Sequence, residues 1–119
     1  DYAFRAKLEL PHETALERIA TALRDQGFGI LRSVDMQKTL QEKLGATFRK
    51  YSILGACNPP LAQRALSEDL DAGLVLPCTL VVYEENEGTR IAIADPMKVV
   101  KLLANESLEP IAKDARQKL

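Results

Sequence analysis

The sequence is poor in the residues on which most catalytic and metal sites are built. Its 119 residues contain no tryptophan, one histidine and two cysteines, and only 5% are aromatic. With His12 as the single imidazole, a zinc site made from a Cys/His cluster is excluded. Two cysteines are too few for a secreted disulfide scaffold, and a chain of this length can be stabilised by its apolar core instead. We therefore expect reduced thiols and a cytoplasmic location.

An excess of charge of either sign is also absent. Sixteen Lys and Arg residues stand against 17 Asp and Glu residues, which gives a formal net charge of -1. We therefore expect neither nucleic acid nor an anionic membrane surface as a partner. No apolar run approaches the roughly 20 residues that a membrane-spanning helix needs. The chain does not open with a charged and then apolar leader. Because it begins at Asp1 rather than Met, removal of a leader stays an open alternative.

The periodicity of the apolar residues predicts one domain over residues 1–119. No linker or repeat interrupts the patterned segments, and glycine and proline fall singly or in pairs between them. The expected order of strands and helices is βαβαβαββαα. Strands are expected at residues 2–10, 28–34, 47–56, 74–83 and 89–94, and helices at 11–27, 35–45 and 58–67, from Asp95, and from a cap at Ser107.

This order favours an α+β fold. A hairpin joining residues 74–83 to 89–94 requires an antiparallel pair, and the later helices are short. We expect a five-stranded, largely antiparallel sheet with helices packed on one face. Val75, Val81 and Tyr83 then point away from the helices and leave an apolar patch. Because such patches usually meet a partner, a homodimer is predicted.

The segment Gly55-Ala56-Cys57-Asn58-Pro59 places a thiol where a strand meets a helix. Free amides and the positive end of the helix dipole favour an anion there, so we expect either a Cys57 thiolate or a bound carboxylate or phosphate. Asn58 is expected to cap the helix, and Gly55 to give the backbone clearance. The alternative is that Cys57 is a small buried residue that ends a strand.

The segment Leu76-Pro77-Cys78 places the second thiol beside a residue that cannot donate to a sheet ladder. A bulge, an edge or a break in the strand is therefore expected. If Cys57 and Cys78 converge, they form a redox pair or a two-thiolate site for a soft metal such as Cu(I). If they do not, Cys78 is a core cysteine among leucines. His12 is expected at the surface, away from both.

Three hypotheses for the function follow from these residues. The first is a small binding module of unknown ligand, a small molecule or a soft metal, whose site comprises Gly55, Cys57, Asn58 and Cys78. The second is a structural or protein-interaction homodimer with inert buried cysteines. The third is an enzyme with Cys57 as nucleophile, for which the sequence places no general base. Recognised catalytic motifs are absent, and the sequence names no cofactor.

Several short motifs, in their order along nearly the whole chain, resemble a known family. They are Lys43-Leu44-Gly45, Ile53-Leu54-Gly55-Ala56-Cys57-Asn58-Pro59, Ala65-Leu66, Leu76-Pro77-Cys78, Val81-Val82-Tyr83-Glu84 and Asp95-Pro96. The family is domain of unknown function 302, and the two cysteine motifs are similar to its branch with Cys in both. The resemblance implies a small α+β fold with an antiparallel sheet and a dimeric assembly. It implies no reaction and no catalytic residue.

Overall fold

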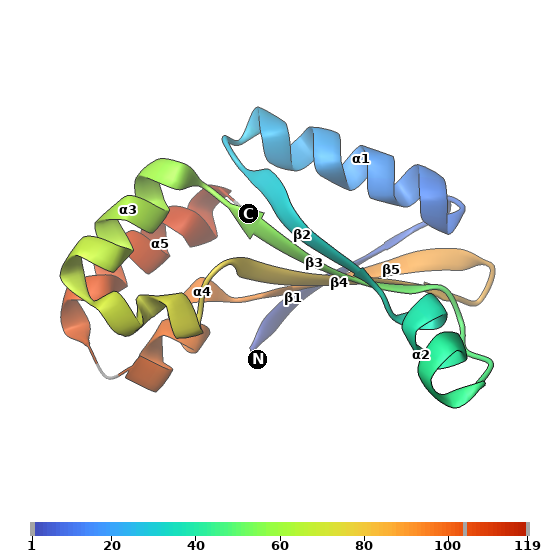
Figure 1. Ribbon diagram of the computed structural model, residues 1–119. Helices are drawn as coiled ribbons and strands as arrows, with labels where there is room; N and C mark the ends of the chain where they lie inside the picture. The colour runs from blue at the N-terminus through green and yellow to red at the C-terminus, as the bar shows by residue number, and fades with distance from the viewer. Residues whose placement is uncertain (1, 104, 119) are drawn as a thin grey trace.

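The computed structural model describes residues 2–103 and 105–118, which form one sheet with helices around it (Figure 1). The strands are β1 (Ala3–Leu8), β2 (Gly29–Asp35), β3 (Tyr51–Cys57), β4 (Cys78–Glu85) and β5 (Gly88–Ala94). The α-helices are α1 (His12–Asp25), α2 (Met36–Leu44), α3 (Pro59–Glu68), α4 (Pro96–Val99) and α5 (Glu109–Lys118). Short 3₁₀ turns are η1 (Leu70–Leu74), η2 (Val100–Leu103) and η3 (Glu106–Leu108).

The sheet has the strand order β1-β5-β4-β3-β2, and each neighbouring pair is antiparallel. β1 and β2 are therefore the edges, and α1 carries the chain from one edge to the other (Figure 1). Between β4 and β5 the chain turns through Asn86 and Glu87, both with positive φ, as a two-residue hairpin loop requires. The expected α+β class with an antiparallel five-stranded sheet is confirmed.

The main core lies between α1 and one face of the sheet. Ile19 and Leu23 on α1 pack there with Phe28 and with alternate residues of the two central strands. The buried strand residues are Leu54 and Ala56 of β3 and Leu80 and Val82 of β4. Because side chains alternate along a strand, the residues between them point to the opposite face. Figure 1 shows α1 along the first face, α2 at one end of the sheet, and α3, α4 and α5 gathered beyond the other end.

The helices begin where short polar side chains can cap them. Asp35 accepts a hydrogen bond from the Lys38 amide at 3.0 Å, and Asp95 accepts one from the Met97 amide at 3.0 Å. Gly45 ends α2 in the left-handed conformation, with φ 64°. These signals act over two to four residues, and the sequence predicted all of them. The last cap is a correction: Asn105, not Ser107, accepts from a backbone amide, that of Ser107.

The strand expected over 74–83 begins only at Cys78. Pro77 has no amide to donate to a ladder, and the Leu76–Pro77 peptide bond is cis. Leu74 ends η1 and is 81% exposed. The expectation that Val75 shares a sheet face with Val81 is therefore wrong, because Val75 lies before the strand. The third strand likewise covers Tyr51–Cys57 rather than 47–56.

A second core joins the helices beyond the end of the sheet. Its buried members are Leu61 and Ala65 of α3, Ala72 of η1, Val100 of η2, Leu108 of η3 and Ile111, Ala112 and Ala115 of α5. Arg64 of α3 is ion-paired with Asp114 of α5 at 2.8 Å. Arg116 lies 3.7 Å from the Asp95 carboxylate and over the Phe4 ring at 5.4 Å. These contacts fix α5 against α3 and against the sheet. Over residues 2–103 and 105–118, the chain forms no helix with the length and apolar character to cross a membrane.

Candidate functional site

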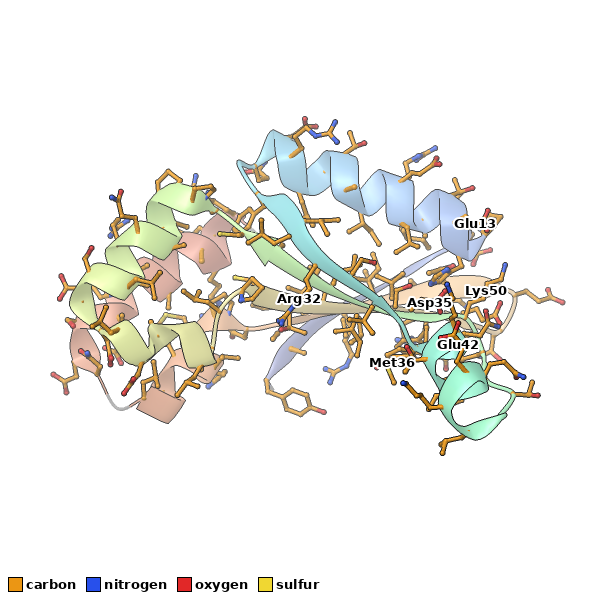
Figure 2. All side chains as sticks on the ribbon, in the orientation of Figure 1. Glu13, Arg32, Asp35, Met36, Glu42 and Lys50 are labelled. Carbon is orange, nitrogen blue, oxygen red and sulfur yellow. The ribbon has the colours of Figure 1, made fainter. Side chains whose placement is uncertain are left out.

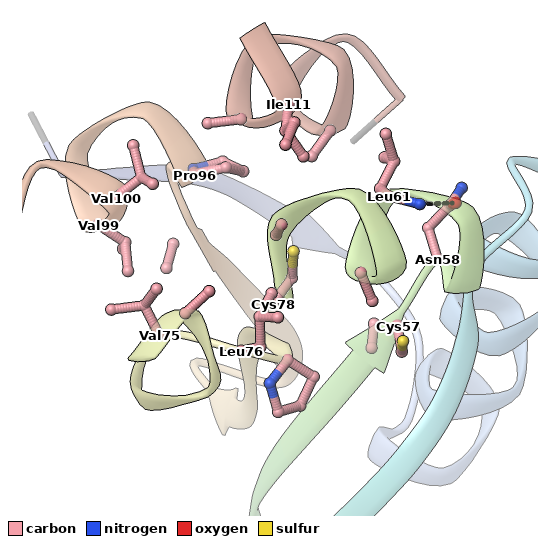
Figure 3. Close-up of a pocket in the computed structure, with 18 of the residues that line it drawn as sticks. Cys57, Asn58, Leu61, Val75, Leu76, Cys78, Pro96, Val99, Val100 and Ile111 are labelled. Carbon is pink, nitrogen blue, oxygen red and sulfur yellow. Dashed lines mark hydrogen bonds between the residues drawn. The ribbon is translucent and has the colours of Figure 1, made fainter. Parts of the chain in front are cut away.

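A cavity of about 100 Å³ lies between the end of the sheet and the second core (Figure 3). We call it the end cavity. Its wall combines the ends of β3 and β4 with residues of α3, α4, α5 and the 3₁₀ turns. The residues labelled in Figure 3 are Cys57, Asn58, Leu61, Val75, Leu76, Cys78, Pro96, Val99, Val100 and Ile111. Among the described residues, none of those that line it carries a charge.

Small side chains leave this space open. Ala65 of α3, Ala72 of η1, and Ala112 and Ala115 of α5 are buried and line the cavity. A larger aliphatic residue at any of these positions would extend into it. Because packed cores normally leave few voids larger than a water molecule, an open apolar space here is notable.

Three of the four predicted site residues line the end cavity. Cys57 ends β3, Asn58 follows it, and Cys78 begins β4. Gly55 does not line the cavity, and its role is steric. A Cβ built on it would lie 2.5 Å from Pro77 Cγ, so the missing side chain makes room for the Pro77 ring, which does line the cavity.

Asn58 caps α3 as predicted, with Oδ1 accepting from the Leu61 amide at 3.2 Å. The expected anion cradle at this helix start is not formed. Pro59 and Pro60 have no N–H groups, the Leu61 amide is bonded to the Asn58 side chain, and the Ala62 amide donates to the Asn58 carbonyl at 2.9 Å. The first turn of α3 therefore has no free amide for a carboxylate or phosphate.

The register of the sheet separates the two thiols. Ala56 lies opposite Cys78, so Cys57 projects to the other side of the sheet from Cys78. In Figure 3 the two sulfur atoms do not point toward one another. Both cysteines are free and half-buried. Burial raises the pKa of the Cys78 thiol above its ordinary value, and the nearby Cys57 thiolate charge raises it further.

These facts bear on the metal hypothesis. Burial first, and then the charge of an ionised Cys57, raise the pKa of Cys78, which disfavours a pair of thiolates. Within the described part of the chain, no three His, Cys, Asp or Glu side chains gather as a metal site would need.

His12 corrects the expectation of a surface residue. Its Nε2 lies 3.2 Å from the Val82 carbonyl oxygen and 3.3 Å from Ser52 Oγ, and Ser52 is buried. A carbonyl only accepts, so Nε2 carries the proton that it donates to Val82. It is then not a base for the Ser52 hydroxyl, and this Ser–His contact is structural. The partners lie 40 and 70 residues away in sequence, so no local pattern announces them.

The fold and cavity define a class of small α+β proteins with an all-antiparallel five-stranded sheet and an apolar space where the sheet meets its later helices. Residues 4–119 match the family model described as "Domain of unknown function DUF302", and the chain belongs to this family. A crystal structure of the uncharacterized conserved protein DUF302 from Bacillus stearothermophilus is similar, with a TM-score of 0.90 and 35% sequence identity. The match covers 98% of this chain and 91% of that one. No functionally curated protein matches significantly.

Proposed function

We propose that the protein binds a small, neutral and mainly apolar molecule, or the apolar end of a larger one, in the end cavity. The observation that carries this proposal is the cavity itself, about 100 Å³ with an uncharged wall of mostly aliphatic side chains. Burying an unpaired charge in such a wall is costly, which disfavours a charged group inside it. The Leu61 and Ala62 amides at the start of α3 are already hydrogen-bonded to Asn58, which likewise disfavours an anionic ligand.

The size of the cavity limits the ligand. An engineered apolar cavity of about 150 Å³ stays dry and takes up benzene. The end cavity is somewhat smaller, so it suits a group of up to about six non-hydrogen atoms. Asn58 lies at its wall, where its Oδ1 already accepts from the Leu61 amide. A small ligand with an apolar body fits these features.

The two thiols contribute polarizable surface rather than charge. The raised pKa of Cys78 keeps its sulfur protonated in the neutral range, where it contacts a ligand as a soft, weakly polar group. Free, half-buried thiols suit a reducing compartment, so a cytoplasmic location is part of the proposal. A redox or soft-metal role for the thiols is the less supported alternative, because the register places them on different sides of the sheet.

Benzene tests this function as a probe in thermal unfolding. A ligand that binds only the folded state raises Tm with its concentration, and we expect this for the wild type. Ala112→Leu on α5 fills the cavity, so its Tm should not respond to benzene. Ala22→Leu introduces the same side chain at an exposed position of α1 and should respond as the wild type does. If Ala112→Leu does not fold, Ala65→Val on α3 replaces it. A wild type that shows no rise near benzene saturation, or an equal rise in wild type and filled variant, rejects the proposal.

A further inference from the structure

The face of the sheet opposite α1, which we call the open face, has a half-buried apolar and aromatic centre. Alternation from the buried residues of β3, β4 and β5 places Tyr51, Ile53, Val81, Tyr83 and Ala92 there. In Figure 1 the described helices lie along the other face and beyond the two ends of the sheet. The open face therefore presents an apolar strip across three strands, with no helical layer over it.

Cations flank this strip on both sides. Arg5 and Lys7 of β1 and Arg90 of β5 share the open face on one flank, and Arg32 of β2 lies on the other. Figure 2 shows Arg32 on the side of β2 away from α1. One carboxylate of the strands, Glu85, joins them and is ion-paired with Arg90 at 3.2 Å. The described strand residues of this face thus carry more positive than negative charge, although the whole chain has a net charge of -1.

The register strengthens this point. Lys7 lies directly opposite Arg90 in the antiparallel pair of β1 and β5, and like charges in that position destabilise a sheet. Glu85 compensates Arg90, whereas in residues 2–103 and 105–118 no carboxylate lies within ion-pair distance of Lys7 or Arg32. An anionic group docked on the open face would compensate the positive charges of Lys7 and Arg32.

The sequence predicted a second copy of the chain as the partner of this patch, and the charges favour a different occupant. Two open faces packed together would bring cations of both copies into one interface, where the described strands supply a single carboxylate from each copy. Single-stranded nucleic acid is also disfavoured. Tyr51 and Tyr83 stack on one another, with ring centroids 5.3 Å apart and planes at 11°, so each covers one face that a base would use. The rest of the strip is aliphatic.

We propose that the open face docks an acidic, amphipathic segment of a partner protein. Its apolar side chains would cover Ile53 and Val81, and its carboxylates would face Arg32 on one flank and Lys7 on the other. Complementary charge of this kind fixes the register of a docked segment and speeds its encounter.

Two synthetic amphipathic helical peptides of equal length, one built from Leu and Glu and one from Leu and Lys, test the proposal by fluorescence anisotropy. The Leu/Glu peptide should bind and the Leu/Lys peptide should not. Arg32→Glu should weaken binding of the Leu/Glu peptide about tenfold. The matched control Arg18→Glu, on the exposed side of α1, should leave it unchanged.

Three results would overturn the proposal. Equal binding of the two peptides would show that charge does not select the partner. Sedimentation showing a dimer that Ile53→Arg dissociates would assign the face to a second copy. Binding of an oligothymidylate but of neither peptide would assign it to nucleic acid. None of these outcomes depends on the end cavity, so this proposal and the proposed function fail independently.

Discussion

The ring of Pro77 occupies the space that a side chain at Gly55 would need. A Cβ at Gly55 would lie 2.5 Å from Pro77 Cγ and 3.4 Å from Arg32 Cβ. The ring is fused to the backbone, so it cannot swing aside as a flexible side chain would. Gly55 thus holds the segment before β4 close to β3, where that segment forms part of the wall of the end cavity.

Gly55→Ala should therefore destabilise the protein. Overpacking of this kind typically costs about 1–3 kcal/mol, because the strand or the proline must shift. Gly29→Ala is the matched control, since a Cβ at Gly29 meets no atom within 4 Å. Urea unfolding followed by circular dichroism measures both. Equal midpoints for the two variants would contradict this account of Gly55.

Two substitutions of Asn58 distinguish its role as the cap of α3 from the preference of the end cavity for uncharged ligands. Asn58→Ala should lose about 1 kcal/mol of stability, because the Leu61 amide loses its acceptor. Asn58→Asp keeps an acceptor and should retain most of that stability, yet it adds a negative charge at the cavity wall. We expect it to weaken the benzene-induced rise in Tm. A full benzene response in Asn58→Asp would show that Asn58 does not face the bound probe.

The ionisation of Cys78 should depend on Cys57. Burial is the larger cause of the raised pKa of Cys78, and the charge of Cys57 is the second. In Cys57→Ser, the midpoint for alkylation of Cys78 should move to lower pH, yet stay above that of the unfolded chain. Mass spectrometry of iodoacetamide-treated protein across pH gives this midpoint. An unmoved midpoint would show that the two thiols do not interact.

The same shift predicts how stability depends on pH. Because the folded pKa of Cys78 lies above the ordinary value of 9.0, the folded state holds this proton more tightly than the unfolded state. The resulting stability is fully present below pH 9.0 and is lost as the pH rises through the folded pKa. Cys78→Ala should show a smaller decrease over that range in urea unfolding. Identical pH profiles would rule out this linkage.

The two ion pairs of α5 should differ in importance. Arg64 and Asp114 are both about half exposed, so Arg64→Ala should change stability by less than about 1 kcal/mol. Arg116 instead faces the Asp95 carboxylate, which is 3% exposed, and it also covers Phe4. In Arg116→Ala the Asp95 carboxylate stays buried and keeps the hydrogen bond from the Met97 amide but loses its cation. This variant should therefore lose more stability than Arg64→Ala. Urea midpoints in the opposite order would contradict this ranking.

Much of the fold follows from signals within a few residues of one another. The caps at Asp35, Asn58 and Asp95 were predictable because each side chain bonds an amide two or three residues ahead. The strand expected from residue 74 was wrong because an alternating apolar pattern continues into the loop before Pro77. Alternation reports burial, and Val75 is partly buried in the cavity wall rather than in the sheet.

The candidate site was predictable only in part. The sequence placed Cys57 and Asn58 together because they are neighbours at the junction of a strand and a helix. For Cys78, expected inside a strand beside Pro77, it gave only the hypothesis that the residue lies near them. It could not place Leu61, Val100 and Ile111 around them, since these come from three different helical segments that meet only in the folded chain. It also missed the proline pair's effect, which is to remove the donors that an anion site needs.

The irregularity in β2 has a consequence for solubility. Leu31 is an extra residue between Ile30, opposite Ala56, and Arg32, opposite Gly55, and it is 71% exposed. A regular outer strand with apolar side chains is a template on which further chains can add and grow into fibrils, and a bulge interrupts that template. Deleting Leu31 should straighten the strand and increase light scattering on storage. We therefore expect the bulge to oppose polymerisation through the edge strand β2.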